Sequence, residues 1–283
     1  SICRILGHRA PEHFTYELFL DEHGQKISKS SGNGISIDEW LTYASTESLG
    51  YFMYLKPQTA KRMHFDVIPK AVDEYHQHLR AYDTQDEAAR LNNPVYHIHE
   101  GDVPKSDMVV PFSMLLNLAS VAASEDKDGL WGFIQRYAPE ANAESNPQLD
   151  AAAGYAVRYF NDFVKPTRVF RAPTDQERAA LEDLVKALKD AELARAMIET
   201  KNKAMGNDEP VAPLDMTDGE DLQSIVFAVG KNHGFENLRE WFAAIYEVLM
   251  GASQGPRFGS FIALYGVDET IELIQKGLAG EPG

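Results

Sequence analysis

Apolar residues recur at helical spacing along most of this chain. A helix is expected from Thr46, because the next apolar residues fall on one face, and it must end before Pro57, since the residue before a proline avoids helical backbone angles. A second helix is expected over residues 67–82, with Pro69 tolerated in its first turn. The apolar faces of these two helices are Leu49, Phe52 and Met53, and Val72, Tyr75, Leu79 and Tyr82.

From Pro111 onward the pattern is helical almost throughout. Helices with one apolar stripe each, joined by short loops, pack as a bundle or cage. The chain is therefore expected to be mainly α. The expected apolar faces are Met114, Leu115, Leu118, Val121 and Ala122; Leu130, Phe133, Ile134 and Tyr137; Leu181, Leu184, Val185 and Leu188; Leu222, Ile225, Val226 and Val229; and Leu238, Trp241, Phe242, Ile245 and Leu249, the last helix stopping at Gly251.

Three short polar strings predict where helices begin. Each has Ser or Thr followed three residues later by Glu, which is the pattern of a capping box. The pairs are Ser36 with Glu39, Thr174 with Glu177, and Thr217 with Glu220. We expect helices to begin directly after these three N-caps.

Three segments depart from helical spacing. Residues 14–20 are rich in β-formers and end in a turn at 21–24, which predicts a strand. Residues 92–107 look like a linker or an irregular crossing, so a domain boundary is expected near them. Residues 205–216, which contain one glycine and two prolines, predict a flexible loop.

Length and composition indicate an ordinary globular chain. It has 283 residues, 44% of them hydrophobic, which is enough for one large domain or two compact ones. Cys3 is the only cysteine, so a disulfide and a cysteine-based zinc site within one chain are excluded, and a reducing cytoplasmic compartment is expected. No apolar run approaches the roughly 18 residues of a membrane span, so no membrane partner is expected.

The net charge of −16 by itself argues against a nucleic-acid partner, because phosphate binding depends on Lys and Arg. The charge is uneven, however. Residues 154–171 carry four basic side chains and one acidic one, whereas residues 207–221 carry six acidic and no basic side chains. Local basic stripes on an acidic body permit binding to one RNA fold without attracting every polyanion.

The stretch with the clearest chemistry is Gly24–Gly34, which we call the candidate phosphate loop. Glycines allow close approach to an anion, serine hydroxyls and backbone N–H groups donate hydrogen bonds, and Lys26 and Lys29 add positive charge. A helix N-terminus is expected just after it, at Ser36. The alternative is a solvated surface loop, which has a similar composition.

The order of residues in this loop favours the first interpretation. Lys26-Ile27-Ser28-Lys29-Ser30, followed by Gly32-Asn33, is similar to the KMSKS-x-GN signature of class I aminoacyl-tRNA synthetases, with Ile in place of Met. The flanks Tyr16–Leu20, Asp38–Leu41 and Lys56–Arg62 resemble the class I lysyl-tRNA synthetase family in its bacterial version. This resemblance extends to Gly255–Phe261. Ser31 stands where many such signatures carry a third Lys.

The resemblance implies a fold in three parts. Residues 1–45 would be the end of a catalytic nucleotide-binding domain carrying the KMSKS-like loop. Residues 46–103 would be a helical stem-contact region, and residues 104–283 an α-helical cage that binds the anticodon. No HxGH-type motif occurs in the sequence, so we expect this chain to be the carboxy-terminal portion of a longer enzyme and inactive alone.

The implied activity is that of a lysine–tRNA ligase. ATP, with Mg²⁺, and lysine would be substrates and tRNA(Lys) the partner, with no metal held by this chain and a monomer favoured over an obligate oligomer. Lys26 and Lys29 would be catalytic. The ATP-binding set would be Lys26, Ser28, Lys29, Ser30, Gly32 and Asn33, and Gly24, Gly32 and Gly34 would let the loop move.

Candidate tRNA contacts are Lys56, Lys61, Arg62, Arg239 and Arg257. Arg and aromatic side chains stack on unpaired bases, which suits an anticodon loop. For Trp241 and Phe258, core packing is the better interpretation, because both fit apolar stripes. For Arg257, which lies between Pro256 and Phe258, no structural role is evident from the sequence.

Two further interpretations remain open. The chain could be a stand-alone tRNA-binding module without aminoacylation activity, or part of a related glutamyl-type synthetase. His97 and His99 would share one face of a strand and suggest a metal site, but no further ligand follows at suitable spacing, so a polar loop is the better explanation.

Overall fold

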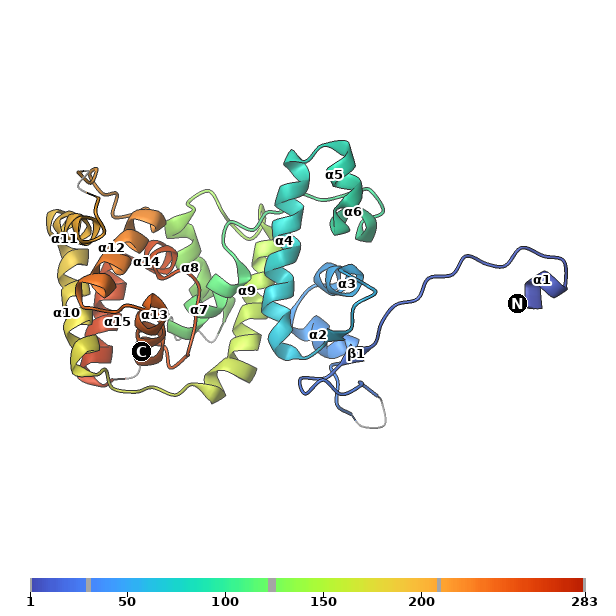
Figure 1. Cartoon of the computed structure of the whole chain (residues 1–283), viewed down its shortest axis with the longest axis horizontal. Helices are drawn as coiled ribbons and strands as arrows, with labels where there is room; N and C mark the ends of the chain where they lie inside the picture. The colour runs from blue at the N-terminus through green and yellow to red at the C-terminus, as the bar shows by residue number, and fades with distance from the viewer. Residues whose placement is uncertain (1, 29–31, 122–125, 208–209, 282–283) are drawn as a thin grey trace. The chain divides into compact units, whose positions relative to one another are not determined.

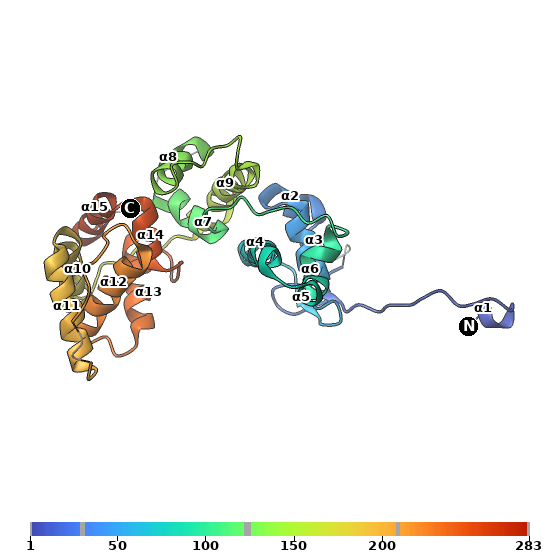
Figure 2. The ribbon, with the colours of Figure 1, turned by 90° about the horizontal axis from the view of Figure 1, so that it is seen from above.

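The computed structural model describes residues 2–28, 32–121, 126–207 and 210–281. The chain forms two compact units, residues 1–106 and 107–283 (Figures 1 and 2). Most residues of the described chain as a whole are helical, which confirms the expected mainly α class. The three-part division inferred from the resemblance stays a prediction.

The first unit combines a two-stranded parallel sheet with helices. Phe19 of β1 pairs with Lys61 of β2, and Leu20 pairs with Arg62. Its elements are α1 (Ile2–Ile5), β1 (Phe19–Leu20), α2 (Ile37–Tyr43), α3 (Thr46–Tyr54), β2 (Lys61–Arg62), the 3₁₀ turn η1 (Phe65–Val67), α4 (Ile68–Thr84), α5 (Glu87–Asn92) and α6 (Pro94–Ile98). The strand expected over residues 14–20 is thus regular only at its last two residues.

A core of aromatic and aliphatic side chains holds α3, α4 and α6 together. Tyr51, Tyr75, Leu79 and Val95 form this cluster, and each is at most 3% exposed. Trp40 of α2 is fully buried and donates its indole N–H to Ser48 Oγ of α3 at 3.3 Å. The helices expected from Thr46 and over residues 67–82 are therefore confirmed. Tyr75 and Leu79 of the face expected on α4 lie in this core, whereas α3 contributes Tyr51, and Met53 of its expected face is 41% exposed.

The second unit is a layered set of helices. Figures 1 and 2 show α10, α11 and α12 side by side. The elements are α7 (Phe112–Val121), α8 (Lys127–Tyr137), α9 (Pro147–Tyr159), the π turn η2 (Phe160–Val164), the 3₁₀ turn η3 (Lys165–Thr167), α10 (Asp175–Lys189), α11 (Ala191–Ala204), α12 (Gly219–Asn232), α13 (Leu238–Leu249), α14 (Phe258–Tyr265) and α15 (Val267–Ala279).

The helices α12 and α14 cross at a point where no side chain fits. A Cβ on Gly259 would lie 2.3 Å from the backbone nitrogen of Gln223 and 2.4 Å from the carbonyl oxygen of Gly219. The buried Gln223 accepts a hydrogen bond from the Gly259 N–H through Oε1 at 2.8 Å. This crossing gives a structural reason for glycine in the Gly255–Phe261 string.

The expected N-cap at Thr217 is wrong, and the expected linker over residues 92–107 is only partly irregular. The N-cap of α12 is Asp218, whose Oδ1 accepts from the backbone N–H groups of residues 220 and 221, while Thr217 bonds to Asp215 instead. The segment 92–107 is not wholly irregular, because Asn93 caps α6 through a bond from Val95 N–H at 3.2 Å. The capping boxes at Ser36 and Thr174 are confirmed.

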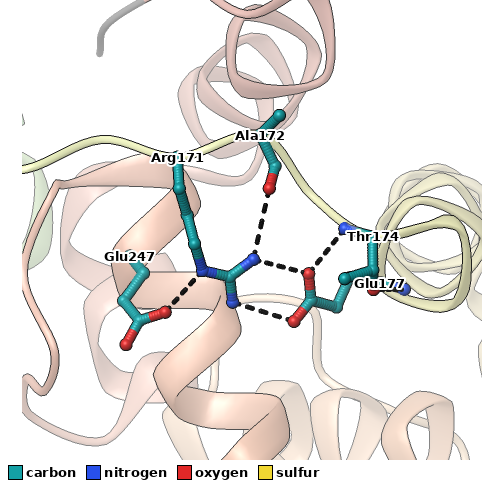
Figure 3. Close-up of polar contacts among 5 residues, drawn as sticks. All are labelled: Arg171, Ala172, Thr174, Glu177 and Glu247. Atoms are coloured by element: carbon teal, nitrogen blue, oxygen red, sulfur yellow. Dashed lines mark hydrogen bonds and ion pairs between the residues drawn. The ribbon is translucent and has the colours of Figure 1, made fainter.

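Arg171 joins the segment before α10 to two helices (Figure 3). Its guanidinium donates two bonds to Glu177, at 2.7 and 2.8 Å, and one to Glu247 of α13, at 2.6 Å. Glu177 also accepts from the Thr174 N–H at 2.7 Å, completing the capping box. The hydrogen bonds from Arg171 keep the pKa of Glu177 below its ordinary value.

We expect Arg171→Ala to lower the free energy of unfolding by about 2 kcal/mol, because it leaves the mostly buried Glu177 without its cation. Solvent screens part of the effect, since the Arg171 side chain is 35% exposed. Urea unfolding of the 283-residue chain measures it.

Arg195→Ala is the matched control. The Arg195 side chain is also 35% exposed, but within the described part of the chain its ion pairs are with Glu192 and Glu199, both on its own helix. Its loss is expected to cost less than about 0.5 kcal/mol. Equal destabilisation by the two variants would contradict the special role of Arg171.

Candidate functional site

The candidate phosphate loop returns against the strand that precedes it. Leu20 and Lys26 form an antiparallel bridge, and the Ile27 N–H donates to the Phe19 carbonyl at 3.1 Å. Between them Asp21 closes a tight turn, its N–H donating to the Gln25 carbonyl at 2.8 Å. Gly24 takes a positive φ of 78° in this turn, which explains why a glycine stands there. The backbone of Lys26 is thereby held, and its side chain is exposed.

The far side of the loop is tied back by Asn33. Its Oδ1 accepts from the Ser28 N–H at 3.0 Å, and its Nδ2 donates to Asp21 Oδ2 at 2.8 Å and to the Lys26 carbonyl at 3.1 Å. Asp21 is only 7% exposed. Hydrogen bonds to its carboxylate, first of all from the Gln25 N–H, hold its pKa below the ordinary value.

A glycine completes the contact between the two sides of the loop. A Cβ on Gly34 would lie 2.4 Å from Cγ2 of Ile27, so the side chain of Ile27 occupies that space. The capping box of α2 follows directly, with the Ser36 N–H donating to Glu39 at 2.7 Å. Lys26 and the start of α2 are therefore on one short, internally bonded stretch of chain.

Part of the predicted site lies outside the described residues. Lys29 and Ser30 belong to that part, and the neighbouring Ser31 also lies outside the described residues. Of the others, Lys26 and Gly32 are exposed, and Gly32 takes a positive φ of 60°. Ser28 and Asn33 are half-buried. The catalytic and ATP-binding roles of these residues stay predictions.

The three basic candidates of the first unit differ in environment. The Lys61 ammonium donates to the carbonyls of Phe52 and Met53 near the end of α3, at 2.6 and 3.1 Å, and lies over the Phe52 ring. Burial lowers its pKa. Lys56 and Arg62 are exposed. Lys61 thus has a structural task that the sequence did not indicate, and tRNA contact stays a prediction for all three.

Lys56 and Lys61 line a cavity of about 890 Å³ in the first unit. Its walls are mostly apolar and include Phe14, Tyr16 and Tyr54. Arg62 is not among its lining residues.

The two arginine candidates of the second unit line a single cavity of about 520 Å³. Arg239 is exposed near the start of α13, and Arg257 is the N-cap of α14. Phe227 and Phe242, packed edge to face with ring centroids 5.4 Å apart, form an apolar wall. An aromatic wall beside two guanidinium groups suits stacking and phosphate contact with an unpaired nucleotide.

Arg257 does have a structural partner, contrary to expectation. Its guanidinium forms a two-pronged ion pair with Glu220 at the start of α12, with Nη2 and Oε2 2.7 Å apart. This pairing raises the pKa of Arg257. Glu220 was expected only as part of a capping box, so the partner was not recognised. Trp241 and Phe258 are fully buried, which confirms core packing for both.

Two arginines of the basic stretch 154–171 serve the fold. Arg168 donates to the carbonyls of Met250 and Ser120, at 2.7 and 3.2 Å, and Arg171 holds Glu177 and Glu247. The local excess of positive charge in the sequence therefore overstates the charge that remains available to an RNA partner.

His97 and His99 lie at the end of α6, so the strand expected to carry them is wrong. His97 Nε2 contacts the Leu91 carbonyl at 2.8 Å, and His99 Nε2 contacts the Tyr75 hydroxyl at 3.0 Å. Among the described residues, no three His, Cys, Asp or Glu side chains gather closely enough to hold a metal ion. Within the same residues no helix has the length and hydrophobicity to cross a membrane.

Gly34→Ala is expected to disturb the loop, because the added methyl group would collide with Ile27. We expect amide hydrogen exchange of residues 26–28 to become about tenfold faster. In an Ile27→Ala background, which removes the colliding atoms, the same change should have a smaller effect. Equal acceleration in both backgrounds would rule out this contact as the cause.

The sequence comparisons identify relatives for nearly the whole chain. Residues 1–102 match the family model described as tRNA synthetases class I (K). The chain is 69% identical over 281 residues to a lysine–tRNA ligase of Roseobacter denitrificans, covering 99% of the chain and 49% of that protein. It is 45% identical over 277 residues to the lysine–tRNA ligase of Rickettsia conorii, and 46% identical over 280 residues to that of Rickettsia bellii. These matches cover 97% and 98% of the chain, and 49% of each relative.

The chain thus spans about half the length of the curated relatives that it matches. The resemblance drawn from the loop and its flanks is confirmed, because along nearly its whole length this sequence is similar to class I lysine–tRNA ligases.

Proposed function

We propose that this sequence works as part of a lysine–tRNA ligase, which activates lysine with ATP and transfers it to tRNA(Lys). The observation that carries the proposal is the Lys26-Ile27-Ser28-Lys29-Ser30 string, with Gly32 and Asn33, in a loop whose two sides are tied together next to the capped start of α2. Our chain would supply this loop and the tRNA-binding surface of the complete protein.

The reaction has two steps. A carboxylate oxygen of lysine attacks the α-phosphorus of ATP, and pyrophosphate leaves with the electrons of the broken P–O bond. A ribose hydroxyl at the tRNA terminus then attacks the carbonyl carbon of lysyl-adenylate, AMP leaves, and the hydroxyl proton is released. Lys26 and Lys29 would offset the negative charge that grows on the leaving pyrophosphate in the first step.

The second unit would hold the anticodon. The support is the cavity that places Arg239 and Arg257 beside the Phe227–Phe242 wall. Guanidinium groups contact phosphates or bases, and an aromatic wall accepts a base that has left its stack. Lys56 and Arg62 of the first unit are exposed cations and would contact the tRNA stem.

The first test replaces the loop lysines in the full-length protein. Lys26→Ala and Lys29→Ala should each lower the rate of lysine- and tRNA-dependent pyrophosphate exchange about a hundredfold, because each removes a cation that stabilises charge in the transition state. Lys189→Ala, at an exposed lysine ending α10, should leave the rate unchanged.

The wild-type protein decides among the alternatives in the same assay. Exchange that depends on lysine supports the proposal, and exchange that depends on glutamate would support a glutamyl-type enzyme. No exchange by the folded full-length protein, together with tight tRNA binding, would leave the stand-alone binding module as the function.

The second test concerns the cavity of the second unit. Arg239→Ala and Arg257→Ala should each weaken tRNA(Lys) binding about tenfold at fixed salt, and Arg195→Ala, on α11 outside the cavity, should not. Glu220→Gln keeps Arg257 and removes its negative partner, so it should bind at least as tightly as wild type. Filter binding at several salt concentrations measures all four variants.

If Arg195→Ala weakened tRNA binding as much as the two cavity variants do, the result would indicate general charge attraction instead of a specific site. Unchanged binding by both Arg239→Ala and Arg257→Ala would remove this cavity from the proposed tRNA interface.

A further inference from the structure

The proposed reaction assigns no role to Asp21, the most buried carboxylate next to the loop. Asp21 follows β1 directly, is 7% exposed, and lies five residues before Lys26 in the sequence. Most carboxylates avoid such burial unless they are paired or hydrogen-bonded. Its environment therefore indicates a specific use.

Both carboxylate oxygens of Asp21 are engaged. Oδ1 accepts from the backbone N–H groups of His23 and Gln25, at 3.0 and 2.7 Å. Oδ2 accepts from Asn33 Nδ2 at 2.8 Å, across twelve residues of chain. The first two bonds shape the turn that leads into the loop, and the third reaches its far side.

Asn33 connects Asp21 to the backbone of the loop. With Nδ2 directed at Asp21 and at the Lys26 carbonyl, its Oδ1 meets the Ser28 N–H at 3.0 Å. An amide has one acceptor oxygen and two donor hydrogens, so these three bonds leave one arrangement of the side chain. The backbone at Lys26 and at Ser28 is thus tied to position 33.

We propose that Asp21 is a positioning residue that acts through Asn33 and holds the phosphate-loop backbone at Lys26 and Ser28. The inference rests on the proposed function and deepens it, because it assigns Asn33 to the loop itself instead of to ATP. Without the Asp21–Asn33 bond, the backbone at Lys26 and Ser28 would have to be ordered in each reaction cycle. The free energy of that ordering would add to the activation barrier of the reaction.

The test uses pyrophosphate exchange by the full-length protein with Asp21→Asn. The new amide keeps an oxygen for the His23 and Gln25 N–H groups but directs a donor at the Asn33 donor. We expect kcat to fall roughly tenfold to a hundredfold, as for the loss of one buried hydrogen bond. The KM for lysine should stay within twofold. Asp38→Asn, the same change at an exposed residue of α2, should have no effect.

The exchanged pair, Asp21→Asn with Asn33→Asp, separates a specific bond from general damage. The amide at position 21 then donates to the carboxylate at position 33, which still accepts from the Ser28 N–H. The bond to the Lys26 carbonyl is lost, and a carboxylate oxygen then faces that carbonyl oxygen, so recovery is expected to be incomplete. We expect kcat within about fivefold of wild type, higher than for either single change.

Asn33→Ser serves if Asp21→Asn fails to fold, because it keeps the buried carboxylate and its two turn bonds. It should lower kcat as much as Asp21→Asn while the protein remains folded. Wild-type kcat in Asn33→Ser, or an exchanged pair no better than its worse single variant, would overturn the inference. Absence of exchange in the wild type would instead refute the proposed function.

Discussion

A carboxylate withdrawn from water must accept hydrogen bonds or pair with a cation. Each unit has such a carboxylate, one just after β1 and the other in the first turn of α10. In the first unit Asp21 accepts hydrogen bonds from two backbone N–H groups and from the Asn33 amide. In the second unit Glu177 accepts hydrogen bonds from the Thr174 N–H and from the Arg171 guanidinium. Both carboxylates have a lowered pKa for this reason. The loop in one unit and the start of α10 in the other depend on these bonds.

Close approach of the backbone is the second constraint, and it also acts in both units. Gly34 leaves room for Ile27 in the loop, and Gly259 lets α12 and α14 cross. The crossing has a consequence for the proposed interface. It brings the start of α12 to the start of α14, where Glu220 pairs with Arg257 at the edge of the cavity. The charge offered to an RNA there is set by this ion pair and by the exposed Arg239.

Helix positions were predictable because they depend on short-range patterns. The spacing of apolar residues located α3, α4, α7, α8, α10, α12 and α13, and the capping boxes at Ser36 and Thr174 marked helix starts. No apolar face was predicted for α9, α11, α14 or α15. Of the strand expected over residues 14–20, only Phe19 and Leu20 form a regular strand, because only these two residues pair with β2. The cap at Thr217 moved by one residue because Asp215 competes for its hydroxyl.

The sequence by itself determined the helical class, the loop residues and the family resemblance, since these depend on residue order and local periodicity. Only the tertiary structure decided which polar groups meet across the chain. Asn33 reaches Asp21 over twelve residues, and Arg257 reaches Glu220 over thirty-seven. No local pattern encodes such pairs, because folding brings them together through the packing of other residues. The arginines show the result most clearly: Arg168 and Arg171 hold the fold, whereas Arg239 is exposed beside a cavity.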